Sequence, residues 1–283
     1  MKNVKKYFYE YEDYEDGDKD ASKLAEEILK DPDLSSLKTI IVGCWGETYD
    51  NSCQPIIDMF AQNSEKFSHI ETLFIGDMES EECEVSWIEQ GDYSELIKSL
   101  KNLKHLIIKG SNGLRLGELN HSELESLEII CGGLPKSVIL EIANSNLPKL
   151  KKLNLYLGVE NYGFDGSIED IKKLIENKNF KSLEYLGLGD SEIQDEIVEV
   201  VLNSDIVSNL KVLDFSNGTL SDRGAQIILD NADKLKHLEL LDLHYHFISD
   251  EYMMKLKMLP ININLDEQME NDEEYGNYPM LTE

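Results

Sequence analysis

One recurring pattern of apolar residues runs through most of the sequence. An apolar residue, usually leucine, is followed three and five positions later by two more, as in Leu150, Leu153 and Leu155. The first residues of eight copies are Leu37, Ile70, Leu103, Leu124, Leu150, Leu183, Leu210 and Leu238. They recur about every 29 residues, and a degenerate copy at Ile263 and Leu265 closes the series. Eight ordered copies at a near-regular period indicate a repeat architecture.

Alternate side chains of a strand point to opposite faces, so the second and third residues of each copy point inward together. One repeat cannot bury its own apolar face, so neighbouring repeats must stack. Between the strands, segments such as Ile168–Ile175 and Arg223–Leu229 have helical spacing, and Ser167 and Ser221 stand at the expected N-caps. We therefore predict an α/β fold, a leucine-rich-repeat right-handed solenoid or horseshoe. Its parallel strands would lie on the concave face and its helices on the convex face.

The ends of the chain differ from the repeats. We predict an acidic N-terminal extension and cap at 1–36, in which Lys23–Leu29 is a short helix candidate. The leucine-rich-repeat domain covers 37–268. An acidic C-terminal tail at 269–283 lacks the repeat, and we expect it to be partly disordered or draped over the fold.

Charge and composition restrict the partners. The 283 residues include 56 acidic and 27 basic ones, a net charge of −29, which repels phosphate backbones and makes nucleic acid an unsuitable partner. A protein partner with a basic surface is favoured instead. The sequence has no apolar stretch of about 18 residues and no apolar segment typical of a signal peptide. With four cysteines and no CxxC pair, we expect a cytoplasmic protein that does not bind membranes.

Several strings are more specific than the repeat, and they lie at Glu81–Ile97, Leu155–Asp165, Gly189–Ile197, Ser216–Leu229 and Leu241–Glu251. Across 37–268 the chain resembles bacterial, cytoplasmic, ribonuclease-inhibitor-like leucine-rich-repeat proteins, a family of largely uncharacterised function. Members are often encoded beside radical-SAM-like, ATP-grasp-like and phosphatase- or sulfatase-like enzymes. The resemblance implies a binding or scaffolding role and supplies no catalytic residues.

Candidate partner-binding residues lie on strand positions that point away from the core. Asp214 and Asp242 occupy equivalent positions of adjacent repeats, about 4.8 Å apart in a parallel sheet. Such carboxylates repel and raise each other's pKa unless they are hydrated or meet a cation. We interpret them as a recognition patch for Lys or Arg groups, with further members at Tyr156, Tyr185, Asp190 and His244. The alternative is that strand aspartates of a solenoid are solvated or bond neighbouring backbone.

Two smaller constellations are also candidates. Asp242, His244 and His246 resemble part of a metal site, although a His-rich strand end in solvent is the alternative. Glu81 and Glu82, with Trp87, lie in a long connection that could be a binding loop. For Trp87 we favour packing into the convex layer.

No phosphate-binding loop, nucleophile elbow or HExxH motif occurs, so we predict no cofactor and no catalytic residue. The leading hypothesis is a non-catalytic protein-protein interaction module that binds a partner through its concave face. The alternatives are a scaffold or adaptor subunit of a modifying enzyme complex, and a metal-binding protein or hydrolase centred on the late Asp and His residues. The sequence leaves the oligomeric state unknown.

Overall fold

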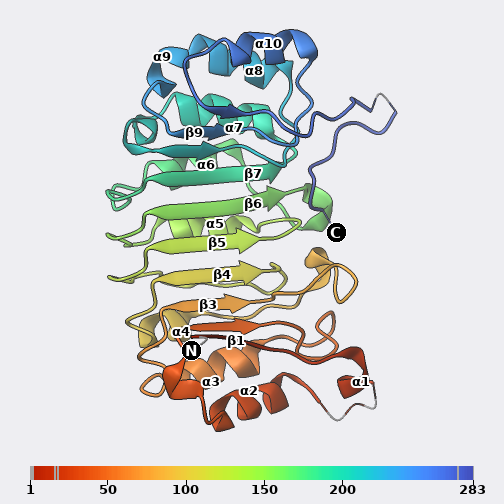
Figure 1. Cartoon of the computed structure of the whole chain (residues 1–283), viewed down its shortest axis with the longest axis vertical. Coiled ribbons are helices and arrows are strands. Elements are labelled where there is room, and N and C mark those ends of the chain that lie inside the picture. Colours follow the sequence, from red (N-terminus) through yellow and green to blue (C-terminus); the bar gives the residue numbers. More distant parts are fainter. Residues whose placement is uncertain (1–2, 16, 18, 273, 283) are drawn as a thin grey trace.

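The computed structural model describes residues 3–15, 17, 19–272 and 274–282. Ten parallel strands form one sheet in which the spatial order equals the chain order (Figure 1). They are β1 (Val4–Tyr7), β2 (Thr39–Val42), β3 (Thr72–Ile75), β4 (His105–Lys109), β5 (Ser126–Ile130), β6 (Lys152–Gly158), β7 (Tyr185–Ser191), β8 (Val212–Asp214), β9 (Leu240–Asp242) and β10 (Ile263–Asn264). The prediction of an α/β solenoid with a parallel sheet is confirmed.

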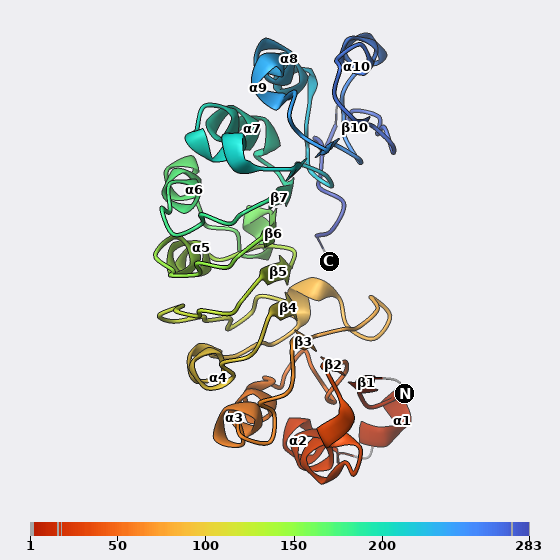
Figure 2. The same cartoon turned by 60° about the vertical axis from the view of Figure 1, so that its left-hand side comes forward.

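The helices connect successive strands, and neighbouring helices such as α5 and α6, or α7 and α8, contact each other. Figure 2 shows α3 to α8 along one side of the stack of strands. The α-helices are α1 (Tyr11–Tyr14), α2 (Ala21–Lys30), α3 (Gln54–Gln62), α4 (Ser94–Ser99), α5 (Lys136–Ala143), α6 (Ile168–Ile175), α7 (Gln194–Leu202), α8 (Asp222–Asp230), α9 (Ala232–Leu235) and α10 (Asp250–Lys257). Short 3-10 helices are η1 (Leu34–Ser36), η2 (Val85–Trp87), η3 (Glu160–Tyr162) and η4 (Asp205–Asn209).

The repeat leucines form the core between sheet and helices. In β6, Leu153 and Leu155 are fully buried, as is Leu150 just before the strand. Strand pairing keeps equivalent leucines adjacent, since Leu153 pairs with Leu127 of β5 and with Leu186 of β7. Each buried aliphatic side chain contributes roughly 1.5–3 kcal/mol, so stacking of repeats stabilises the whole solenoid.

Two local features depart from a uniform repeat. The connection 110–125 between β4 and β5 contains no helix, which accounts for the shortest spacing between repeats. Near the N-terminus, β1 pairs in parallel with β2, so the segment expected to be an extension and cap also supplies a strand of the sheet. Its sequence, VKKY, lacks the leucine pattern because only Tyr7 of this edge strand is buried. None of the described helices is long and apolar enough to cross a membrane.

Candidate functional site

The sheet face opposite the helices, here called the open face, carries one side chain of each repeat at the fifth position of the pattern. Strand register places these residues in one row, and its character changes along the sheet. From β2 to β9 the row reads Ile41, Phe74, Ile107, Glu128, Asn154, Gly187, Asp214 and Asp242. The early repeats therefore present apolar groups, and the later ones present acidic and polar groups.

The middle of the open face holds a connected charged network. The Tyr185 hydroxyl donates a hydrogen bond to Asp214, whose Oδ1 also accepts the Ser216 amide at 2.9 Å. The Lys152 ammonium lies 5.0 Å from the centre of the Tyr185 ring and pairs with Glu128 at 2.5 Å. Burial, and then the charge of Asp214, raise the pKa of Tyr185 far above its usual value. The phenol therefore stays protonated and holds the aspartate in place.

The next repeat carries Asp242 and His244. Asp214 and Asp242 are paired in register, so the two carboxylates are neighbours as the repeat spacing predicts. Asp242 Oδ1 lies 2.9 Å from His244 Nδ1 and accepts the backbone amide of the same histidine at 3.2 Å. Both side chains remain partly exposed. Each aspartate thus has its own donors, and the exposed edges of Asp242 and His244 stay free to contact a partner.

The structure contradicts the metal-site hypothesis at His246. Tyr245 has a left-handed backbone with φ 56°, which breaks the alternation of the strand and turns His246 into the core. His246 Nδ1 accepts the Ile248 amide at 3.1 Å, and Nε2 lies 3.3 Å from the Leu265 carbonyl oxygen. Burial lowers the pKa of this imidazole. Asp242, His244 and His246 therefore do not converge, and the described residues contain no group of three His, Cys, Asp or Glu placed to hold a metal.

Asp190 also differs from its expected place on the surface. Its backbone is left-handed with φ 51°, and its side chain is fully buried. Oδ1 accepts the Leu281 amide at 2.8 Å, whereas Oδ2 has no hydrogen-bond partner among the described residues. Burial raises the pKa of Asp190 to about 8. The C-terminal tail covers this carboxyl group, and the repeat pattern could not predict the position of the tail.

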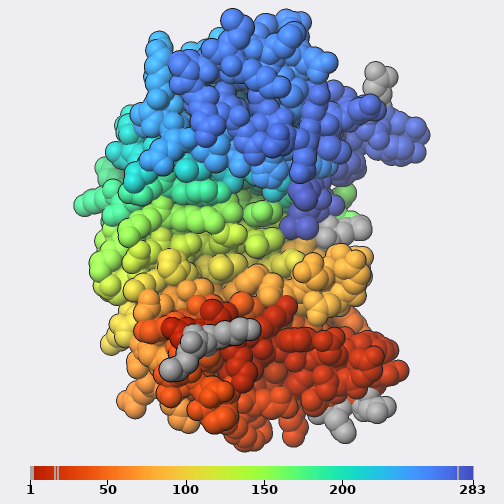
Figure 3. Space-filling view, in the orientation of Figure 1, coloured from red at the N-terminus to blue at the C-terminus, as the bar shows by residue number. Residues whose placement is uncertain are grey.

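The end of the tail crosses three repeats. The Tyr245 hydroxyl donates to the Tyr278 carbonyl at 3.2 Å, and the Met280 amide donates to the Asn217 carbonyl at 2.8 Å. In Figure 1 the tail descends from β10 toward β6. Figure 3 shows it in dark blue over the green repeats, above the orange connection that follows β3.

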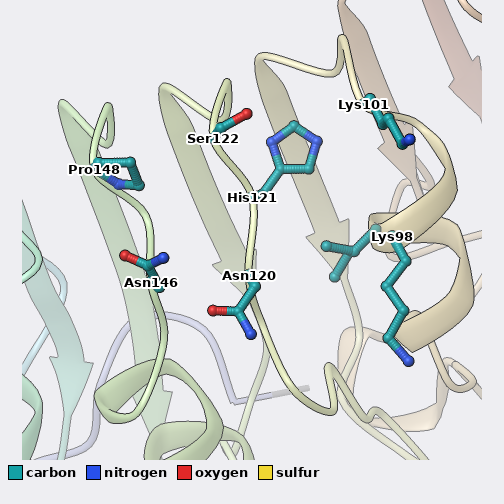
Figure 4. A pocket seen from close by; sticks show the side chains of 8 residues that line it. Lys98, Lys101, Asn120, His121, Ser122, Asn146 and Pro148 are labelled. Atoms are coloured by element: carbon teal, nitrogen blue, oxygen red, sulfur yellow. The ribbon is translucent and has the colours of Figure 1, made fainter.

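A cavity of about 380 Å³ lies elsewhere, beside the helix-free connection after β4 (Figure 4). Its histidine, His121, is already paired, since Nε2 lies 3.0 Å from the Leu100 carbonyl and Nδ1 accepts the Glu123 amide at 3.2 Å. Lys98, at its edge, is paired with Glu95 at 2.8 Å. This cavity follows from the missing helix, and its bonded groups give it no evident chemistry.

A cavity of about 300 Å³ lies between the tail and the β3–α4 connection, on the open face. Its lining mixes apolar and charged groups, namely Phe74, Asp77, Met78, Glu79, Lys109, Ile130, Tyr156, Asn217, Met280 and Leu281. Tyr156 is the predicted candidate that lines it. Burial, and then the charge of Glu128, raise the pKa of Tyr156 to about 12. The phenol is therefore a neutral hydrogen-bonding group in the cavity wall.

The β3–α4 connection borders this cavity and carries Glu81 and Glu82, both exposed. Glu82 folds back to accept the Glu79 amide at 2.8 Å. Trp87 is 57% exposed, contrary to the packing that we favoured, because Val85 and Ile88 fill the interior on either side of it. In Figure 2 this connection projects on the side of the sheet opposite the helices. The loop hypothesis therefore concerns the same face as the aspartates.

Comparison with known proteins shows which proteins this chain is similar to. No protein-family model matches it, and no curated protein does. An internalin from Listeria monocytogenes is 15% identical with a TM-score of 0.39, covering 82% of this chain and 61% of the internalin, a likeness too weak to indicate shared function. A Bacteroides fragilis protein of known crystal structure is 43% identical, with a TM-score of 0.91 over 99% of this chain and 77% of its own. This chain belongs to the same family as that Bacteroides fragilis protein.

Proposed function

We propose that this chain is a non-catalytic protein-interaction module that binds a protein partner through its open face. We further infer a ribonuclease-inhibitor-like, right-handed horseshoe in which the open face is concave. The arrangement in Figure 2 supports the curvature, since β1 and β10 both lie further to the right than β6 and β7. The four described cysteines are buried free thiols, which suits a cytoplasmic location.

The observation that carries the proposal is the polypeptide already lying against this face. Residues 278–281 contact the chain through backbone atoms at Tyr245, Asn217 and Asp190, with no regular secondary structure of their own. The face can therefore hold a protein segment by hydrogen bonds. Beside that segment lie a cavity of about 300 Å³ and the charged network around Asp214, which can supply contacts to a larger surface.

The chemistry of the late repeats favours a basic partner. Along the row of fifth positions, Glu128, Asp214 and Asp242 are acidic, and Lys152 is the cation that contacts the first of them. The net charge of −29 adds a long-range attraction for cationic surfaces. Binding should consequently weaken as salt rises, because the screening length falls from about 10 Å at 0.1 M to about 3 Å at 1 M.

Differential affinity capture tests the proposal. Three proteins would be immobilised and exposed to an extract of the organism that encodes the chain: the wild type, a variant with Asp242→Lys and Glu128→Lys, and a variant with Glu176→Lys and Asp58→Lys. The second pair makes the same charge change at exposed residues, one at the C-cap of α6 and one in α3, on the helix side of the sheet. We expect a protein retained by the wild type and by the control variant, and depleted at least tenfold by the open-face variant. Equal retention on all three, with all three folded by circular dichroism, would refute binding through this face.

A further inference from the structure

Three successive repeats place a residue with a left-handed backbone at the same position, four residues after the second leucine of the pattern. They are Asp190, Asn217 and Tyr245, with φ of 51°, 64° and 56°. Glycine is the usual residue for this conformation, and each non-glycine residue in it costs on the order of 1–3 kcal/mol. The same strained conformation thus occurs three times in register. It orients the polar groups of these residues differently from those of a strand that continues in extended conformation.

All three residues contact the same segment of the tail. Tyr245 donates through its hydroxyl to the Tyr278 carbonyl, Asn217 accepts the Met280 amide through its carbonyl, and Asp190 accepts the Leu281 amide through its carboxylate. On the tail, every one of these contacts uses a backbone atom. These three hydrogen bonds therefore recognise the backbone of an extended polypeptide.

The tail side chains are unevenly buried. Tyr278 is 51% exposed and Met280 57% exposed, whereas Pro279 is buried and Leu281 is half-buried against the core. Pro279, between them, has no amide hydrogen to donate, and the row of contacts requires none at that position. The segment is held by three hydrogen bonds to its backbone, each worth about 0.5–1.5 kcal/mol net, and by the apolar contacts of Pro279 and Leu281. Another extended segment that offers the same backbone groups can compete for this place.

The receiving surface is built for a closely approaching chain. A side chain at Gly132 would bring its first carbon within 2.3 Å of the Thr282 carbonyl oxygen, so the tail end fits because glycine stands there. Asp190 Oδ2 and Asn217 Oδ1 are buried without hydrogen-bond partners even though the tail is present. Because the Asp190 carboxyl group is protonated at neutral pH, its Oδ2 is an unused donor, and Asn217 Oδ1 is an unused acceptor.

We propose that Asp190, Asn217 and Tyr245 form a peptide-binding track that takes an extended polypeptide through its backbone. The C-terminal segment 277–282 occupies this track as an intramolecular ligand, and an extended segment of a partner displaces it. This inference rests on the proposed function, because it names the part of the partner that the open face takes: an extended peptide. The unused groups favour a partner segment that offers an additional acceptor to Asp190 and an additional donor to Asn217.

The experiment uses the full chain and a fluorescein-labelled peptide of sequence NYPMLT, which corresponds to residues 277–282. Leu281→Pro removes the amide that Asp190 accepts and frees the tail. Thr282→Pro is the matched control, since it makes the same substitution where no amide hydrogen bond occurs. In fluorescence anisotropy we expect Leu281→Pro to bind the peptide at least tenfold more tightly than either wild type or Thr282→Pro. If the tail occupies the track more than about 90% of the time, the track is free less than about a tenth of the time, and the apparent affinity of a competing peptide falls at least about tenfold.

A second measurement needs no variant. In amide hydrogen exchange of the wild-type chain, the Met280 and Leu281 amides should exchange at least tenfold more slowly than their intrinsic rates, and the Thr282 amide near its intrinsic rate. Unprotected Met280 and Leu281 amides, or peptide binding that is absent or equal in the three proteins, would overturn the track. Either result would leave the open-face capture experiment unaffected, so the two proposals can fail separately.

Discussion

Replacing Asp190 by asparagine should change how the stability of this protein depends on pH. Asp190 is fully buried, and its pKa is raised to about 8 by burial, whereas an aspartate in an unfolded chain titrates near 3.9. Between these two values the folded chain retains a proton that the unfolded chain has released. The free energy of unfolding therefore falls as pH rises through this window, by about 1.4 kcal/mol for each pH unit.

The window from pH 5.5 to pH 8.0 stays above the isoelectric point of about 4.5. Over these 2.5 pH units the Asp190 contribution falls by about 3 kcal/mol. Asparagine keeps a side-chain oxygen that can accept the Leu281 amide, but it cannot titrate. Relative to wild type, Asp190→Asn should therefore gain about 3 kcal/mol of unfolding free energy between the two pH values. Taking the difference between two proteins removes contributions that they share, including that of the buried His246.

Urea unfolding at several pH values, followed by fluorescence of the buried Trp45, measures this difference. Asp50→Asn, at an exposed carboxylate, serves as the control and should stay parallel to wild type throughout. The reasoning would be refuted if the gap between wild type and Asp190→Asn stayed constant within about 0.5 kcal/mol across the window. That result would mean that the native site accommodates the ionised carboxylate at no cost.

Three further expectations concern the scaffold. Gly158→Ala should lower the unfolding free energy by more than about 2 kcal/mol, because its φ is +72° and the added carbon would lie 1.7 Å from a carbonyl oxygen of the preceding repeat. Gly276→Ala is the control in the same urea titration. It should cost about 1 kcal/mol, because its φ is +82° but no atom lies within 4 Å of the added carbon. Asp170→Asn should cost about 1–3 kcal/mol at pH 7, since the hydrogen bond from Ser167 and the ion pairs with two lysines keep the pKa of this carboxylate low. In wild type that stabilisation should disappear as pH falls below about 4, in the same urea titration. The buried thiols of Cys53 and Cys131, whose pKa burial raises to about 12, should resist a thiol reagent at pH 8 and react fully in denaturant, as mass spectrometry would show.

The strands between 37 and 265 could be predicted because each carries the residues that fill its share of the core. Leu153 and Leu155, for example, are both members of the pattern and members of the buried layer. β1 could not be predicted, since an edge strand that buries only Tyr7 needs no leucine pattern. Pairing with β2 determines its structure, and pairing leaves no periodic trace in the sequence of a four-residue strand.

Within the candidate site, alternation along a strand predicts neighbours only as far as the strand continues. Asp214 and Asp242 lie inside strands, and the structure pairs them in register. Asp190 is the next-to-last residue of β7 and is itself left-handed, and His246 lies beyond β9, directly after the left-handed Tyr245. There the two-residue period no longer applies, and both side chains are buried instead of facing the partner surface.

The tail shows why composition alone was insufficient at the C-terminus. Acidic residues and the missing repeat indicate that 269–283 cannot build a core, and they say nothing about hydrogen bonds made by its backbone. The Met280 and Leu281 amides find acceptors because the repeats at Asn217 and Asp190 turn through left-handed residues and hold those acceptors in a line. Asparagine and aspartate are the non-glycine residues that enter this conformation most readily, but Tyr245 is not among them. A left-handed tyrosine directly after a leucine pattern could therefore not be predicted from the sequence. The burial of His246 and the contact with the tail at Tyr278 both depend on it.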